Sequence, residues 1–151
     1  MTRSVMRRGG HVGLTKEMLL PLSTEKVRSL SLENHMALAV VRSGNGDCDQ
    51  VTCLLRVVYL AFYMRNETAS GFDLDLYRRA EAVLDACIAR AECDEPWMLQ
   101  ENEAAHVERL LVVHDEQLAA VPKHRYLAAW DRLQRFVNGT RLSPIPNVEI
   151  K

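Results

Sequence analysis

Four cysteines are the residues of this chain whose type and spacing could do chemistry. Cys48 and Cys53 fall near the start of one predicted helix, and Cys87 and Cys93 near the end of the next. An antiparallel hairpin would gather all four at one end, which suits a Cys₄ zinc site or a redox pair. The spacings differ from a tight zinc knuckle, because helical residues five or six apart point to different faces. We therefore expect Cys53 and Cys87 to be small core residues, with no cofactor, and Cys48 to be the best candidate for a reactive thiol, because a helix N-terminus favours the thiolate.

A second set, His106, His114, Asp115 and His124, suggests metal chemistry. The dipeptide His114–Asp115 resembles the core of the helical HD phosphohydrolases, which need further His and Asp ligands from other helices. His106 and His114 are about 80° apart around a helix, so they are not a natural ligand pair. We expect His114 to be partly buried and hydrogen-bonded to a neighbour, with His106 and His124 on the surface. The sequence has no glycine-rich phosphate loop and no nucleophile elbow, so we expect a non-enzymatic protein.

Composition points to one ordinary globular domain. The 151 residues are 48% hydrophobic and 26% charged, with a net charge of -1, so no overall field attracts DNA or an anionic membrane. The longest apolar run, 51–64, falls short of the ~20 residues that cross a bilayer, and the basic N-terminus lacks the apolar stretch of a secretory signal. We expect a cytoplasmic protein with reduced thiols and no contact with membranes.

Apolar residues repeat at helical spacing almost throughout 23–138. The predicted fold class is all-α, a helical bundle of about five helices. A flexible basic tail is expected over 1–16, a single bundle domain over 17–139, and an extended, proline-containing tail over 140–151. The predicted core holds Leu38, Val41, Leu55, Val58, Phe62, Leu84, Ile88, Leu111, Leu118, Trp130 and Leu133.

Capping residues set the expected helix boundaries. The first helix begins at Ser23 or Thr24 and ends at the Gly-rich run 43–46. The next two begin after an aspartate, at 47 or 49 and at 73 or 75, and the second helix, apolar on two sides, is expected at the centre. A fourth helix is expected from about Trp97 to Val121, with Pro96 in its first turn, and a fifth to about Asn138.

One segment carries a family resemblance. The run LLPLSTEKVRSLSLENHMALAVVRSGNGD, which covers residues 19–47, resembles the start of a group of short proteobacterial helical proteins that are sometimes labelled Fis-like transcriptional regulators. The resemblance implies a regulatory role and assigns no functional residue.

Basic residues make DNA binding one alternative. Arg125, Arg132 and Arg135 lie on the last predicted helix, and Arg7 and Arg8 lie in the basic N-terminal tail. Arg125 and Arg132 are one heptad apart and share a face, so they could contact phosphates together. These five arginines are the predicted nucleic-acid contacts.

Apolar and aromatic residues favour the other alternative, a module that binds proteins. Leu19 and Leu22 belong to a leucine-rich segment before the first helix, and Tyr59, Tyr63 and Phe72 gather around the turn between the second and third helices. We expect core packing for these aromatics first, with a binding surface as the rival interpretation. Apolar surface of this kind is typically covered by a partner. We predict a homodimer that also binds a protein partner, because two-fold association is the commonest outcome.

Overall fold

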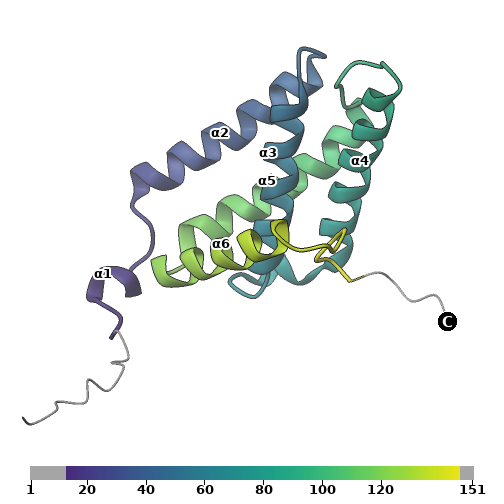
Figure 1. Cartoon of the computed structure of the whole chain (residues 1–151). Helices are drawn as coiled ribbons and strands as arrows, with labels where there is room; N and C mark the ends of the chain where they lie inside the picture. Colours follow the sequence, from purple (N-terminus) through teal and green to yellow (C-terminus); the bar gives the residue numbers. More distant parts are fainter. Residues whose placement is uncertain (1–12, 147–151) are drawn as a thin grey trace, which may run out of the picture.

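The computed structural model describes residues 13–146, and within this range all regular structure is helical. The elements are α1 (Lys16–Leu19), α2 (Thr24–Arg42), α3 (Cys48–Tyr63), η1, a 3₁₀ turn (Ala69–Phe72), α4 (Leu74–Glu92), α5 (Glu101–Ala120) and α6 (Lys123–Val137). The predicted all-α bundle is confirmed (Figure 1). None of the helices in the described range is long and apolar enough to span a bilayer.

The second predicted helix, α3, is the central one, as its two apolar stripes indicated. It contacts α2, α4, α5 and α6, and half of its residues are buried. Figure 1 shows α2 and α4 on either side of α3, with α6 across its lower end. The two stripes of α3 therefore face different neighbours at the same time.

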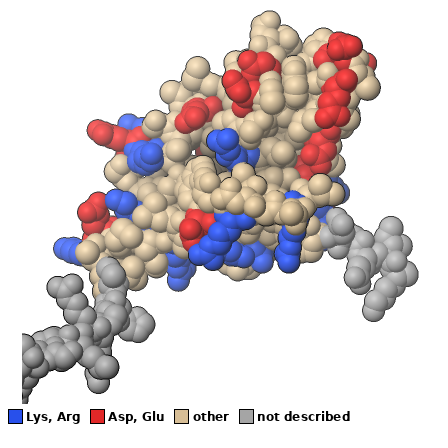
Figure 2. Space-filling model, viewed as in Figure 1, with Lys and Arg blue, Asp and Glu red and all other residues tan. Residues whose placement is uncertain are grey.

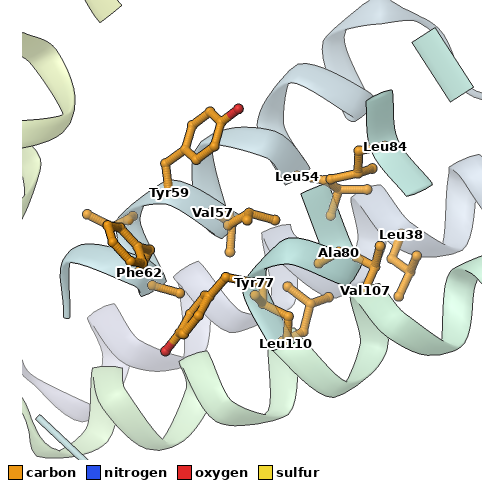
Figure 3. Packing of buried hydrophobic residues seen from close by; sticks show 14 of the residues in the cluster. Leu38, Leu54, Val57, Tyr59, Phe62, Tyr77, Ala80, Leu84, Val107 and Leu110 are labelled. Atoms are coloured by element: carbon orange, nitrogen blue, oxygen red, sulfur yellow. The ribbon is translucent and has the colours of Figure 1, made fainter. Parts of the chain in front are cut away.

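The core is close to the predicted one. Eight of the eleven predicted residues are buried, and Leu55, Ile88 and Trp130 are partly buried against the same cluster. The Phe62 and Tyr77 rings meet edge to face, with centroids 5.7 Å apart (Figure 3). Such a pair adds about 0.5–1.5 kcal/mol beyond burial alone.

Helix starts follow the predicted caps. The Ser23 hydroxyl accepts a hydrogen bond from the Lys26 amide at 3.2 Å, Asp47 from the Asp49 amide at 2.8 Å, and Asp73 from the Asp75 amide at 3.0 Å. Each oxygen satisfies an amide that has no partner within its own helix.

The predicted start of the fourth helix is wrong. Residues 97–100 are not helical, and α5 begins only at Glu101, where Gln100 and Glu103 form a capping box. Leu99 is buried in the core, and its amide donates to the Val41 carbonyl at 3.4 Å. This tertiary contact holds the segment extended, so Pro96 lies before the helix rather than in its first turn.

Helix α1 was not predicted, and it lies against the start of α6. Pro21 pairs with Pro122 in an isolated antiparallel bridge, and the Lys123 amide donates to the Leu20 carbonyl at 2.9 Å. The Lys123 ammonium also meets Glu17 at 2.9 Å. Because α1 begins at Lys16, the expected tail boundary at residue 16 falls inside a helix.

The segment after α6 contains no helix or strand over 140–146, as its prolines predicted, yet it docks on the bundle instead of projecting from it. Ile145 is buried in the core. The Ser143 hydroxyl donates to Glu81 at 2.6 Å, and the Arg78 Nε donates to the Pro146 carbonyl at 2.9 Å.

Candidate functional site

A groove of about 700 Å³ opens where the C-terminal ends of α3 and α6 meet the segment that follows α6. Arginines and aromatic rings dominate its lining, and two prolines are part of it. The lining residues are Phe62, Tyr63, Arg65, Arg132, Arg135, Phe136, Gly139, Thr140, Arg141, Pro144 and Pro146. We call this feature the arginine groove.

Two of its guanidinium groups are held by aromatic rings. The Arg65 Cζ lies 4.3 Å from the centroid of the Phe62 ring, and its Nη1 donates to the Phe62 carbonyl at 3.0 Å. The Arg132 Cζ lies 4.6 Å from the centroid of the Tyr63 ring. Cation–π contacts of this kind fix the planes of both groups before any ligand arrives.

The groove has more positive than negative charge. Within the described range, no carboxylate oxygen lies within 4.0 Å of Arg65, Arg132 or Arg141, whereas Arg135 pairs with Asp131. Figure 2 shows Lys and Arg gathered along the lower part of the visible face, and Asp and Glu along its upper right, over α4. The arginine groove is therefore a local basic site on a protein of nearly neutral charge.

The pKa of Tyr63 shows that two of these positive charges lie close to its ring. Burial raises the pKa of its phenol, and the positive charges of Arg132 and Arg141 oppose that rise. Arg141 follows α6 and Arg132 lies on it, so two separate segments bring their guanidinium groups to one ring.

The predicted nucleic-acid residues are only partly brought together. Arg132 and Arg135 line the groove, but Arg125 lies nearer the start of α6, where its Nη1 meets Glu67 at 3.3 Å. Arg7 and Arg8 lie outside the described residues. Sequence reasoning missed Arg65 and Arg141, because no spacing rule joins residues that follow two different helices.

The predicted protein-binding residues are spread over the molecule. Tyr63 lines the groove, and Leu19 and Phe72 are 54% and 63% exposed at other sites. Tyr59 is buried with its ring 5.3 Å from that of Phe136, so it packs in the core, as first expected, and does not belong to the alternative binding surface. Leu22 is partly buried against the core.

The cysteines do not form a shared site. Cys48 and Cys93 are exposed, Cys53 is half-buried and Cys87 is buried. In the described part of the chain, no group of three or more His, Cys, Asp or Glu side chains is placed to hold a metal ion. Burial raises the pKa of the Cys53 and Cys87 thiols, which disfavours their thiolate forms.

Three described histidines, His35, His114 and His124, bond to other parts of the chain. His114 is buried and its Nδ1 lies 3.0 Å from the Gln117 Oε1, and burial lowers its pKa. The neighbouring Asp115 pairs with the His35 Nε2 at 2.8 Å. His106 and His124 are half-buried rather than on the surface, and the His124 Nδ1 meets the Met18 carbonyl at 2.9 Å.

Comparisons with known proteins add no family. No protein-family model, no curated protein and no solved structure matched the chain. The resemblance of residues 19–47 to the Fis-like proteins therefore stays a prediction, and function has to be argued from the arginine groove itself.

Proposed function

We propose that this protein is a non-enzymatic binding module of the cytoplasm that holds an acidic segment of a partner protein in the arginine groove. The observation that carries the proposal is the approach of three guanidinium groups without a described carboxylate partner, on Arg65, Arg132 and Arg141, to one aromatic-lined groove. Groups that are already oriented bind a carboxylate with a small loss of conformational freedom.

The chemistry of the groove suits Asp or Glu side chains on an extended peptide. A guanidinium presents paired N–H donors that match the two oxygens of a carboxylate. Tyr63 and Phe136, which are only partly buried, offer apolar surface between the charges, and an apolar side chain of the same peptide would cover it. Charged groups would give a fast approach, and aromatic contacts would give residence time.

DNA binding is the second candidate, because Arg132 and Arg135 lie exposed on the last helix. The distribution of charge favours an acidic peptide over DNA. Duplex DNA needs a broad positive surface, whereas here Asp131 and Glu67 already occupy Arg135 and Arg125. An acidic peptide needs only the local charge of the groove.

The test uses an octaglutamate peptide and a DNA duplex that carry the same fluorophore. Each is titrated with the protein at low salt, and binding is followed by fluorescence anisotropy. The groove variant carries Arg65→Gln, Arg132→Gln and Arg141→Gln. The matched control carries Arg28→Gln, Arg79→Gln and Arg109→Gln, which removes the same charge from exposed positions elsewhere. We expect the groove variant to bind the peptide at least about tenfold more weakly and the control to change about twofold or less.

Two outcomes would overturn the proposal. One is an absence of peptide binding by the wild-type protein, and the other is an equal loss in both variants, which would show a response to net charge alone. If the duplex binds instead, with a steep salt dependence that Arg125→Ala, Arg132→Ala and Arg135→Ala together flatten, the DNA alternative replaces the first.

A further inference from the structure

A separate cavity of about 90 Å³ lies inside the bundle, between α2, α3, α5 and α6. It does not share a lining residue with the arginine groove. Apolar side chains form most of its wall, among them Leu60, Leu118 and Trp130, and two buried polar side chains, Asn34 and His114, join them.

The two polar side chains lack partners on the cavity side. Asn34 is 6% exposed and His114 is 1% exposed. Among the described residues, none hydrogen-bonds to the Asn34 carboxamide, and the one hydrogen bond of the His114 ring uses Nδ1. Asp115 Oδ1 is the one described side-chain atom that is both sealed off and unpaired, so the free atoms of Asn34 and His114 still reach open space. Buried amides and imidazoles are nearly always hydrogen-bonded, so these atoms call for a partner inside the cavity.

The neighbouring network determines what that partner must offer. The Gln117 Nε2 donates to the Ala61 carbonyl at 3.0 Å and to the Met64 carbonyl at 3.3 Å, which fixes the orientation of this amide. Its Oε1 therefore faces His114 and can only accept, so Nδ1 carries the ring proton. The remaining Nε2 of the neutral ring is an acceptor and requires a donor.

Water is a poor occupant for the whole cavity. A buried water needs two to four polar partners. The deeply buried partners here are Asn34 and His114, the charged Glu33 and Arg56 lie at the opening, and the leucines of the wall offer none. The volume exceeds that of one water, which would leave further waters against Leu60, Leu118 and Trp130 without hydrogen bonds. A molecule with a polar head and a hydrocarbon body matches both parts of the wall.

The entrance favours an uncharged molecule. Cys53 lines the cavity, and the charges of Glu33 and Arg56 act on its thiol in opposite directions, so both lie beside it. Glu33 and Arg56 are exposed and place one charge of each sign at the opening. Their opposite fields give neither an anion nor a cation an advantage.

We propose that this cavity binds a small neutral amphipathic molecule of about four to six non-hydrogen atoms, with an N–H or O–H donor directed at the His114 Nε2 and a hydrogen bond to the Asn34 carboxamide. The size follows from comparison with an engineered cavity of about 150 Å³ that admits benzene. A primary carboxamide fits best, because it offers the donor to His114 and complements both atoms of Asn34.

The probe is isobutyramide, added to ¹⁵N-labelled protein and followed by NMR. We expect saturable shifts of the Trp130 indole and of amides around the cavity, with a dissociation constant on the order of 1–10 mM. Isopropyl methyl ketone has a similar shape and no donor, and isobutyrate carries a charge, so both should bind at least about tenfold more weakly.

Two variants locate the site. Asn34→Leu removes the polar partner and should abolish the isobutyramide shifts, whereas Asn102→Leu, at an exposed position on α5, should leave them unchanged. Leu60→Phe keeps both polar groups and fills the space, so it should also abolish binding if Asn34→Leu fails to fold.

Three results would overturn the proposal. They are an absence of saturable shifts in the wild-type protein, equal binding of the ketone, and shifts that survive both cavity variants. The arginine groove plays no part in these measurements, so their failure leaves the proposed function untouched.

Discussion

Gln117 joins three parts of the core, and Gln117→Leu is the most informative single change. Its amide is fully buried and bonds to the Ala61 and Met64 carbonyls at the end of α3 and to the His114 ring, at 3.0, 3.3 and 3.0 Å. The Nε2 also makes a longer and weaker contact, at 3.4 Å, with the Tyr77 hydroxyl. Leucine has a similar volume, so the substitution removes hydrogen bonds without opening a large cavity.

The expected loss follows from those contacts. Three buried hydrogen bonds contribute about 1 kcal/mol each, and the unpaired His114 Nδ1 costs about 1 kcal/mol more. The apolar transfer of leucine offsets about 1 kcal/mol. The free energy of unfolding should therefore fall by about 3 kcal/mol, which lowers Tm by about 6–12 °C for a domain of this size.

Urea unfolding followed by circular dichroism at 222 nm measures this loss. Tyr77→Phe tests the edge of the same network, because it removes a hydroxyl that donates to the Gly71 carbonyl at 2.8 Å and accepts from the Gln117 Nε2 at 3.4 Å. It should cost about 1 kcal/mol. A double variant, His114→Leu with Gln117→Leu, should lose less than the two single losses combined. A loss below about 1 kcal/mol for Gln117→Leu would refute the network argument.

Three further predictions follow from other sites. Burial lowers the pKa of His114 below its ordinary value, so the unfolded chain binds a proton that the native state does not. The free energy of unfolding should therefore fall as pH drops below about 6.5. Urea titrations at several pH values measure this slope, which His114→Leu should reduce. A Cβ added at Gly71 would lie 2.5 Å from the Arg65 carbonyl oxygen, whereas one at Gly13 would meet nothing within 4 Å. Gly71→Ala should therefore lower the free energy of unfolding by about 1–3 kcal/mol, and Gly13→Ala should leave it almost unchanged. If the chain forms a homodimer through its exposed leucines, the double variant Leu19→Glu with Leu20→Glu should have a light-scattering mass of 17.1 kDa and unchanged helicity. A wild-type protein that is monomeric across a dilution series would contradict the dimer.

Local chemistry made the helix boundaries predictable. Ser23, Asp47 and Asp73 act on amides only two or three residues away, so their capping role is visible in the sequence. The late start of α5 was not predictable in this way, because Leu99 is held by Val41, far away along the chain.

The arginine groove shows the same limit. Arg132 and Arg135 were candidates because they lie on one amphipathic helix. Arg65 and Arg141 reach the groove only through the packing of α3 against α6 and of the last segment against the bundle. Helical spacing contains no information on that packing, and it also could not decide between the core and a binding surface for Tyr59.

The bridge between the segment before α2 and the start of α6 has a kinetic consequence. Lys123 opens α6, and its amide has no acceptor within its own helix, so the Leu20 carbonyl, roughly a hundred residues earlier, completes it. Closing a loop of that length is entropically costly, so this contact forms after the helical hairpins and opens before them. In hydrogen exchange, the Lys123 amide should lose its protection by detachment of the N-terminal segment alone, while the amides of α3 exchange only through global unfolding.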